Sequence, residues 1–320
     1  MSIDYIVIVL GEPYSTFSEI IGKYFSKNNK FKQKIILVGN KNLLKEQLNF
    51  LNFKISFNCI LKVEDAKKNM INILNVDFKY SEIFNKISKN SNPYIQNCFK
   101  LSLKILKKFK NRAVFINGPI SKNTFLNKKY LGVTEYLSKK TKSKDEVMLI
   151  YNNKLSVSPI TTHIPLKYVT KRINKNRIIN NVIKINNFYL SKLKKVPKIA
   201  ILGLNPHCET VDKFSEEEKI ILPSIKYLRS KKILISGPFS ADTFFMKKNL
   251  TKFNIVIGMY HDQVLTPIKT LYKFNAINIT LGLPFIRISP DHGPNADMLG
   301  KNKSDPSSFF YAMNFVENLR

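Results

Sequence analysis

The four histidines are the residues of this chain best suited to catalysis or metal binding. His163, His207 and His261 follow apparent strand ends, whereas His292 lies in a turn-rich Asp-His-Gly-Pro segment. Three imidazoles that converge and leave one coordination position open could hold a catalytic divalent metal ion. A single histidine is more often structural, and the spacing of 44 and 54 residues is no local metal-binding signature, so both interpretations stay open.

The stretch from residue 254 to residue 300 is the densest in groups that could bind a substrate. Lys269, Asn278 and Arg287 offer an ammonium, an amide and a guanidinium group, a set that suits a phosphate or a carboxylate. This stretch contains three cations and three anions and therefore has no formal net charge. A surface or structural role for the three side chains is the alternative.

Short apolar runs precede many of these residues. Each run is followed by an amphipathic stretch, which is typical of buried parallel strands joined by crossover helices and predicts an α/β fold. The runs lie at residues 5–10, 35–38, 113–116, 198–202, 233–235 and 255–260. Ligands of such sheets bind at the carboxyl ends of the strands. The Lys-rich segments 99–109 and 186–195 have the pattern of half-buried helices with a solvated basic side.

The length of 320 residues favours two domains, and the formal net charge of +31 is the strongest bias in the composition. Such a charge makes a basic nucleic-acid-binding protein an alternative function. However, 47 of the 53 cations are Lys and only 6 are Arg, the residue that phosphate and guanine recognition favours. We therefore expect no specific nucleic-acid partner.

Composition also constrains the cellular location. No run approaches the roughly 18 consecutive apolar residues of a membrane span. Asp4 and Glu12 stand where a signal peptide would have a basic region and an apolar core. Cys59, Cys98 and Cys208 are an odd set without CxxC spacing, which indicates neither a disulfide framework nor a cysteine metal site. We expect a cytoplasmic protein without a membrane partner.

Several strings in this chain together resemble the 4-hydroxythreonine-4-phosphate dehydrogenase family of pyridoxal phosphate biosynthesis, and they occur in that family's order. They are Thr-Thr-His-Ile-Pro-Leu at 161–166, Gly-Leu-Asn-Pro-His at 203–207, Gly-Pro at 237–238, Ala-Asp-Thr at 241–243, Tyr-His-Asp-Gln at 260–263, Asn-Ile-Thr-Leu-Gly-Leu-Pro-Phe-Ile-Arg at 278–287 and Asp-His-Gly at 291–293. The resemblance covers essentially the whole chain, from Gly-Glu-Pro at 11–13 to the tail.

The resemblance implies two interwoven α/β/α domains with a cleft between them, an architecture like that of isocitrate and isopropylmalate dehydrogenases. A terminal domain, residues 1–125 plus 265–320, would carry the cofactor loop. A central domain, residues 126–264, would carry the metal ligands and the dimer contacts.

The resemblance also implies ligands for a metal ion and a cofactor. His163, His207 and His261 match the ligands of a divalent cation (Zn, Mg, Mn or Co), with the third supplied across a homodimer interface so that two chains share each active site. A second set matches the loop that binds NAD, namely His292, Gly293 and Asp297.

The remaining matches concern the small phosphorylated substrate. Those expected to bind it are Thr134, Lys269, Asn278 and Arg287. Asp242 and Asp262 match acidic residues that line the same pocket, and together with Lys269 they are candidates for the catalytic proton transfer.

The implied activity is NAD-dependent oxidation and decarboxylation of 4-phosphooxy-L-threonine to 3-amino-2-oxopropyl phosphate. This chain departs from the family in having Val133 where a His normally precedes the Thr, and bulky Tyr14 and Phe17 in a loop that is normally glycine-rich. Glycines usual after Asn-Pro-His are also missing at 208–211. We expect retained chemistry with altered substrate handling; a decayed enzyme, or a dehydrogenase of erythronate or threonate 4-phosphate, is the alternative.

Overall fold

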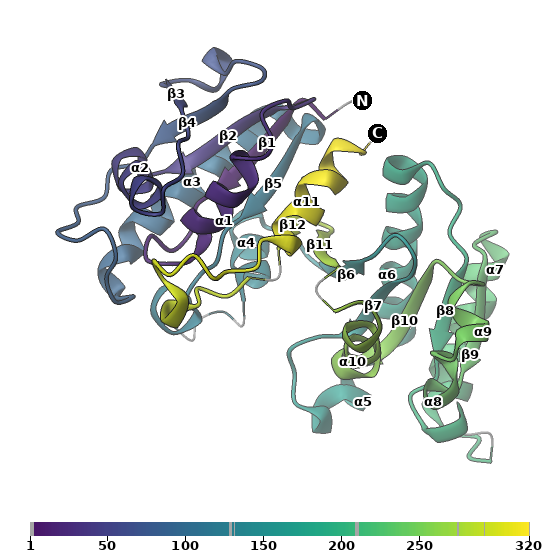
Figure 1. Cartoon of the computed structure of the whole chain (residues 1–320). Helices are drawn as coiled ribbons and strands as arrows, with labels where there is room; N and C mark the ends of the chain where they lie inside the picture. Colours follow the sequence, from purple (N-terminus) through teal and green to yellow (C-terminus); the bar gives the residue numbers. More distant parts are fainter. Residues whose placement is uncertain are drawn as a thin grey trace. The chain divides into compact units, whose positions relative to one another are not determined.

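The computed structural model describes residues 3–127, 130, 132–208, 211–273, 275–290 and 292–319, except for the side chains of residues 247 and 248. The chain divides into two compact units (Figure 1). Unit 1 consists of Met1–Ser143 and Leu283–Leu319, and unit 2 of Lys144–Gly282. Because unit 1 takes residues from both ends of the chain, the two units are interwoven in sequence, as predicted.

Unit 1 is built on a parallel sheet. Its strands, in order across the sheet, are β3 (Phe57–Ile60), β4 (Ile71–Asn75), β2 (Lys34–Gly39), β1 (Tyr5–Val9), β5 (Ala113–Asn117) and β12 (Ile286–Ser289). Its helices are α1 (Phe17–Phe25), α2 (Lys41–Phe50), α3 (Asn92–Phe109), α4 (Val133–Thr141) and α11 (Ser307–Glu317). Every residue of β1 and of β5 is buried, which is why these strands are apolar apart from Asn117 at the end of β5.

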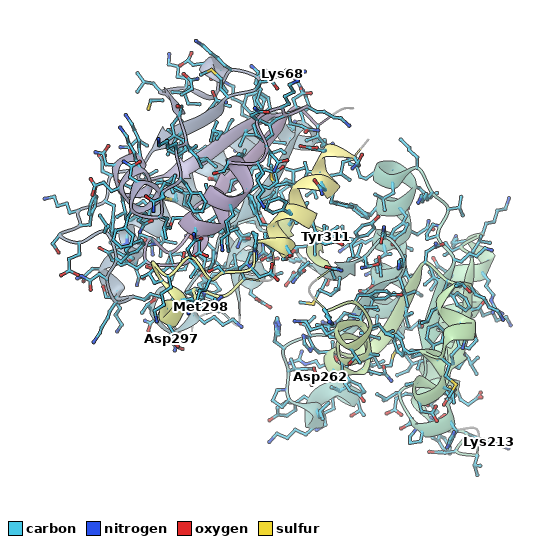
Figure 2. The ribbon with its side chains drawn as sticks, in the orientation of Figure 1. Lys68, Lys213, Asp262, Asp297, Met298 and Tyr311 are labelled. Atoms are coloured by element: carbon cyan, nitrogen blue, oxygen red, sulfur yellow. The ribbon has the colours of Figure 1, made fainter. Side chains whose placement is uncertain are left out.

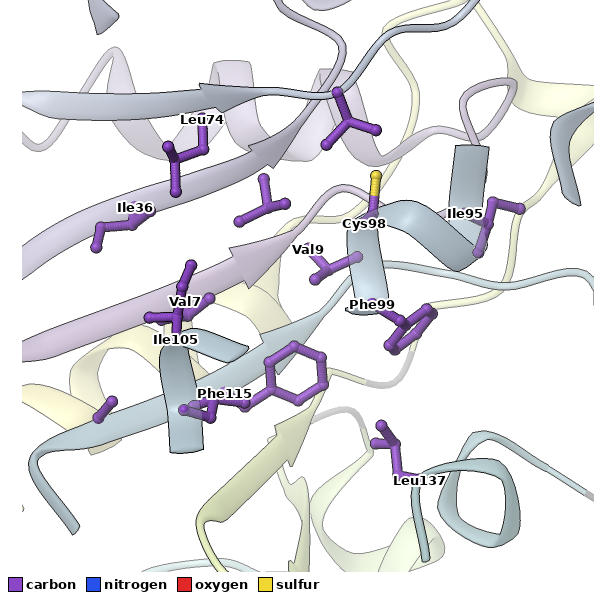
Figure 3. Close-up of a cluster of buried hydrophobic side chains, with 14 of the residues drawn as sticks. Val7, Val9, Ile36, Leu74, Ile95, Cys98, Phe99, Ile105, Phe115 and Leu137 are labelled. Carbon is purple, nitrogen blue, oxygen red and sulfur yellow. The ribbon is translucent and has the colours of Figure 1, made fainter. Parts of the chain in front are cut away.

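The core of unit 1 lies where α3 covers the sheet (Figure 3). Val7 and Val9 of β1 belong to one apolar cluster with Phe99 of α3, and all three are fully buried. The Lys residues of α3 stay on its solvent side, so the half-buried helix predicted over 99–109 is confirmed within a longer helix.

Unit 2 is built on a mixed sheet. Its strands, in order, are β11 (Ile277–Leu281), β6 (Val147–Tyr151), β7 (Ser156–Thr161), β10 (Ile255–Tyr260), β8 (Ile199–Leu202) and β9 (Ile235–Phe239). Its helices are α5 (Val169–Arg172), α6 (Lys175–Phe188), α7 (Leu222–Ser230), α8 (Ala241–Phe244), α9 (Lys247–Leu250) and α10 (His261–Tyr272). The strands β7, β10, β8 and β9 run parallel, whereas β6 and β11 are antiparallel to their neighbours.

The predicted α/β fold is correct, and two local predictions need adjustment. The run 233–235 was expected to be a strand that ends before Ser236, but β9 starts at Ile235 and continues through Gly237 and Pro238. Proline is tolerated there because β9 is the edge strand of unit 2. The helix expected over 186–195 is the end of α6 followed by a π-helical turn. Within the described residues, no helix is long and apolar enough to cross a membrane.

The borders between the units differ from the predicted ones, which fell after residues 125 and 264. Helix α4 belongs to unit 1 because Tyr136 and Leu137 pack in the cluster of Phe99. At the other border, Val264 and Ile268 of α10 pack in the core of unit 2, and β11 pairs with β6. The first part of the expected terminal segment, 265–282, therefore lies in unit 2.

The loop after β1 contains a buried carboxyl group. Glu12 is only 1% exposed and lines a small cavity with Ser18 and Asn40. Among the described residues, neither of its carboxylate oxygens has a hydrogen-bond partner of good geometry. Burial raises the pKa of Glu12 to about 7, and the nearby Ser91 hydroxyl and Tyr14 N–H oppose this rise only in part.

This raised pKa predicts that Glu12 makes folding sensitive to pH. Between pH 4.5 and about 7 the folded chain retains a proton on Glu12 that the unfolded chain releases, so stability falls as pH rises through this window. Glu12→Gln removes the titration, and we expect this variant to be more stable than the original chain at about pH 8, by up to about 3 kcal/mol. Urea unfolding across a pH series measures the difference.

The exposed Glu218 provides a matched control, because Glu218→Gln makes the same chemical change at the surface. A gain from Glu12→Gln that stays constant from about pH 4 to pH 8 would contradict the assignment.

Candidate active site

The three histidines predicted to bind a metal all lie at one edge of the unit 2 sheet. Strand β10 is flanked by β7 and β8, and the parallel register places Tyr260 opposite Thr161 and Ile257 opposite Ile201. The carboxyl ends of the three strands therefore share an edge. His163 follows β7, His207 follows β8, and His261 is the first residue of α10, directly after β10.

His163 and His261 are neighbours within one chain. Their ring centroids are 5.6 Å apart, and Nδ1 of His261 lies 2.7 Å from Oδ1 of Asp262. The exposed Asp262 marks the start of α10 in Figure 2. A carboxylate next to one ring nitrogen can orient the imidazole toward a ligand. One chain supplies both rings of this pair, and the expected supply of His261 by a second chain stays a prediction.

His207 lies in the turn after β8 with a left-handed backbone, φ 55°. The pKa of Asp242 is lowered, chiefly by the Ser240 hydroxyl and also by the nearby His207. Oδ1 of Asp242 accepts hydrogen bonds from Ser240 and from the backbone of Thr243, at 2.5 and 2.8 Å. The structure thus brings His207 near Asp242, and His163 near His261, whose ring contacts Asp262.

The donor set fits a divalent cation in chemistry, and two of its members fit in position. Within the described parts of the chain, no three His, Cys, Asp or Glu side chains form a group that could hold a metal ion. The three-histidine centre therefore stays a prediction.

Arg287 is a buried, hydrogen-bonded side chain of β12 in unit 1. It is 3% exposed, and its Nε donates to Oδ1 of Asn117 at 2.9 Å while Nη1 donates to the Thr134 hydroxyl at 2.8 Å. Burial lowers the pKa of Arg287 to about 10, with the nearby Glu135 opposing the shift. The guanidinium therefore stays charged at neutral pH and is held at two of its nitrogens.

Asn117 was not among the predicted site residues. The sequence did contain a signal, because Asn117 directly follows the apolar run 113–116, at the carboxyl end of β5. Polar residues at that position of a parallel sheet commonly face a ligand.

The other two predicted substrate residues belong to unit 2. Lys269 is exposed on α10. Asn278 lies in β11 opposite Ile150, and its Oδ1 is buried without a hydrogen-bond donor among the described residues. Asn278 can therefore still accept a hydrogen bond from a bound molecule.

The predicted NAD-binding residues lie in unit 1, in the segment after β12. The partly buried His292 and the exposed Gly293 come first, and Asp297 lies in a short 3₁₀ turn next to Met298 (Figure 2). Asp291, which belongs to the same motif, lies outside the described residues.

Helix α1 and the loop before it anchor this segment. The backbone N–H of Thr16 donates to the carbonyl of Pro294 at 3.2 Å. Further along, the N–H of Ser304 donates to Oε1 of Glu19 at 2.6 Å, and Lys23 donates to the carbonyl of Ser304 at 2.7 Å. The loop of Tyr14, which lacks the glycines usual in the family, thus supports the predicted cofactor segment through Thr16.

Solved structures share this two-unit architecture. The crystal structure of 4-hydroxythreonine-4-phosphate dehydrogenase from Klebsiella pneumoniae matches with a TM-score of 0.83 and 27% identity, over 98% of each chain. The fold and the polar residues at its strand ends therefore place the chain in a class of dehydrogenases with two α/β units.

Sequence comparison specifies the family. The chain is 38% identical over 315 residues to the 4-hydroxythreonine-4-phosphate dehydrogenase of Sulfurihydrogenibium sp. (strain YO3AOP1), covering 96% of both sequences. The family model described as pyridoxal phosphate biosynthetic protein PdxA matches residues 31–316, and the chain belongs to that family. The resemblance predicted from the sequence motifs is thus confirmed.

A relative with another substrate in its name also matches. The D-threonate 4-phosphate dehydrogenase of Pectobacterium atrosepticum is 36% identical over 192 residues, which cover 59% of both sequences.

Proposed function

We propose that this chain oxidises 4-phosphooxy-L-threonine with NAD and decarboxylates the product to 3-amino-2-oxopropyl phosphate, a step in the synthesis of pyridoxal 5'-phosphate (vitamin B6). The hydrogen bond between Arg287 and Thr134 carries the proposal. It joins two residues 153 positions apart that were assigned from separate motifs to the binding of one anionic substrate.

Each polar group then has a defined task. The buried guanidinium of Arg287 pairs with an anionic group of the substrate, and Lys269 supplies a second positive charge. The free acceptor of Asn278 takes a hydrogen bond from a hydroxyl or ammonium group. Fixing the substrate at several points places the C3 hydroxyl for reaction, which is a proximity effect.

The reaction needs one base and one hydride acceptor. Lys269, Asp242 or Asp262 would take the proton of the C3 hydroxyl. The segment of His292, Gly293 and Asp297 would hold NAD, which when bound would serve as the hydride acceptor. Loss of carbon dioxide then leaves an electron pair that is stored as an enolate until a proton is returned to carbon. The same base can supply that proton.

We also propose that His163, His207 and His261 bind a divalent cation, Zn, Mg, Mn or Co. When bound beside the substrate, such an ion would lower the pKa of the hydroxyl and polarise the ketone. The paired rings of His163 and His261 support this proposal.

A dehydrogenase of threonate or erythronate 4-phosphate is the second candidate. Val133 occupies the first position of α4, is partly buried and packs on the apolar cluster of unit 1. A valine cannot make the polar contact that the usual histidine would, so the substrate has one fewer polar partner. The match to the Pectobacterium enzyme agrees with this alternative.

The two functions differ in the substrate that yields NADH. We expect the purified chain with Mg, Mn, Co or Zn to reduce NAD with 4-phosphooxy-L-threonine at a kcat/KM at least about tenfold above that with either sugar-acid phosphate. Absorbance of NADH gives the rates, and trapping of carbon dioxide confirms the decarboxylation. NADH formation with the sugar acids alone would select the second candidate.

The fourth histidine provides a matched control for the metal site. Replacement of His163, His207 or His261 by Ala removes an imidazole ligand and is expected to weaken Co²⁺ or Zn²⁺ binding by more than about 100-fold and to abolish turnover. His292→Ala should keep the metal and instead raise the KM for NAD. Elemental analysis and calorimetry measure binding; unchanged metal content in His207→Ala would refute the three-histidine site.

We further propose a cytoplasmic homodimer with shared active sites. The segments after β7 and β8 expose large apolar side chains close to His163 and His207, including Leu166 (69% exposed) and Val211 (89% exposed). Apolar groups of this size at the surface are candidates for burial by a second copy. Cys59, Cys98 and Cys208 are all free thiols, which suits a reducing compartment.

Complementation tests the shared site. His207→Ala disables the metal site, and Arg287→Met disables substrate binding while keeping a side chain of similar length. Dimers that contain one of each variant, selected by two affinity tags, should regain about half of the original activity, because one of the two symmetric sites is intact. Sites confined to single chains would leave the mixed dimer inactive, and a failure to recover doubly tagged protein would refute the dimer.

A further inference from the structure

A buried carboxylate lies beneath the turn that carries His207. Glu217 begins a π-helical turn (Glu217–Ile221) and is 1% exposed. Its Oε1 accepts the backbone N–H groups of Leu204 and Asn205 at 2.6 and 2.9 Å, and its Oε2 accepts Nδ2 of Asn205 at 2.8 Å. Burying a carboxylate is costly unless hydrogen bonds compensate, and here the compensating donors come from this turn.

The backbone of the turn needs such support. His207 and Cys208 both adopt left-handed conformations, with φ of 55° and 63°, which are unfavourable for residues other than glycine. The space beneath the turn is also tight. A Cβ atom on Gly203 would lie 3.0 Å from Oε1 of Glu217 and 2.9 Å from Sγ of Cys208.

The same turn is tied to the strands that carry the other two histidines. Gln263 of α10 donates from Nε2 to the carbonyl of Gly203 at 2.8 Å and accepts the N–H of Met259 at 2.7 Å. The hydroxyl of Thr161, at the end of β7, donates to the carbonyl of Met259 at 2.8 Å. A continuous series of hydrogen bonds therefore connects Glu217 with the ends of β8, β10 and β7.

We propose that Glu217 is a positioning residue that holds the left-handed turn after β8, and thereby sets where His207 stands relative to His163 and His261. This inference rests on the proposed role of the three histidines in metal binding. Glu217 itself touches neither metal nor substrate; it acts through the backbone of Leu204 and Asn205.

Glu217→Gln is the sharpest test, because it keeps the size of the side chain but replaces one acceptor oxygen by an NH₂ group that faces N–H donors. We expect Co²⁺ to bind about 10- to 100-fold more weakly than to the original chain, with an altered Co²⁺ absorption spectrum. The KM for NAD should not change, because the predicted cofactor segment lies in unit 1. Glu218→Gln, one residue further and exposed, should leave Co²⁺ binding unaffected.

A folded Glu217→Gln protein with the original Co²⁺ affinity and spectrum would overturn the proposal. If Glu217→Gln does not fold, Asn205→Ala decides the matter: it removes the side-chain bonds to Glu216 and Glu217 but keeps the backbone bonds, and should weaken Co²⁺ binding by about tenfold. Unchanged affinity in a folded Asn205→Ala protein would then overturn the proposal.

Failure of the metal proposal itself would look different, since the original chain would then bind no Co²⁺. In that case hydrogen exchange of the Leu204 and Asn205 amides decides. Faster exchange in Glu217→Gln than in Glu218→Gln would support the anchoring of the turn, and equal exchange would overturn it.

Discussion

The parallel pairing of β7, β10 and β8 is the constraint on which the candidate metal site depends. Parallel strands in register end at a common edge, so residues far apart in the chain meet there without local signatures. The 5.6 Å separation of the His163 and His261 rings is a direct result. Pairing alone sets only the strand ends, however. The turn after each strand decides where its side chain stands, which is why Glu217 and Gln263 matter as much as the sheet.

The buried charged side chains of the two units differ in how well hydrogen bonds compensate the cost of burying them. Arg287 and Glu217 are nearly inaccessible, and both are hydrogen-bonded. Arg287 donates to Asn117 and Thr134, and Glu217 accepts from the backbone of Leu204 and Asn205. Glu12 is equally buried, but among the described residues its carboxylate oxygens have no hydrogen-bond partner of good geometry, and its pKa rises to about 7. Arg287 and Glu217 thus order the groups around them, whereas Glu12 destabilises the fold when it ionises.

Sequence reasoning predicted the parts of this molecule that have a periodic or motif signal. Buried strands such as 255–260 are continuous apolar runs, and the motifs around His163, His207 and Arg287 identified the family. Strand β9 was mispredicted because Ser-Gly-Pro is typical of a turn, and only its edge position makes a strand possible there. The unit borders were missed because they depend on which core α4 and α10 pack into, a tertiary choice that leaves no pattern in the sequence.

The residues that hold the site were harder to predict than those that could act in it. Glu217 lies in the acidic run 216–218, which reads as an ordinary solvated surface, and nothing in its spacing shows that the middle carboxylate turns inward. The surplus of 31 positive charges is conspicuous in the sequence but lies away from the candidate site residues of the stretch 254–300, which has no formal net charge. The Lys residues of α3, for example, lie on the solvent side of that helix. Such a surface can attract a small anionic substrate over a distance that salt shortens. With the proposed role of Arg287 in substrate binding, selection among anions would come from such buried groups, because they bind in a fixed geometry away from water.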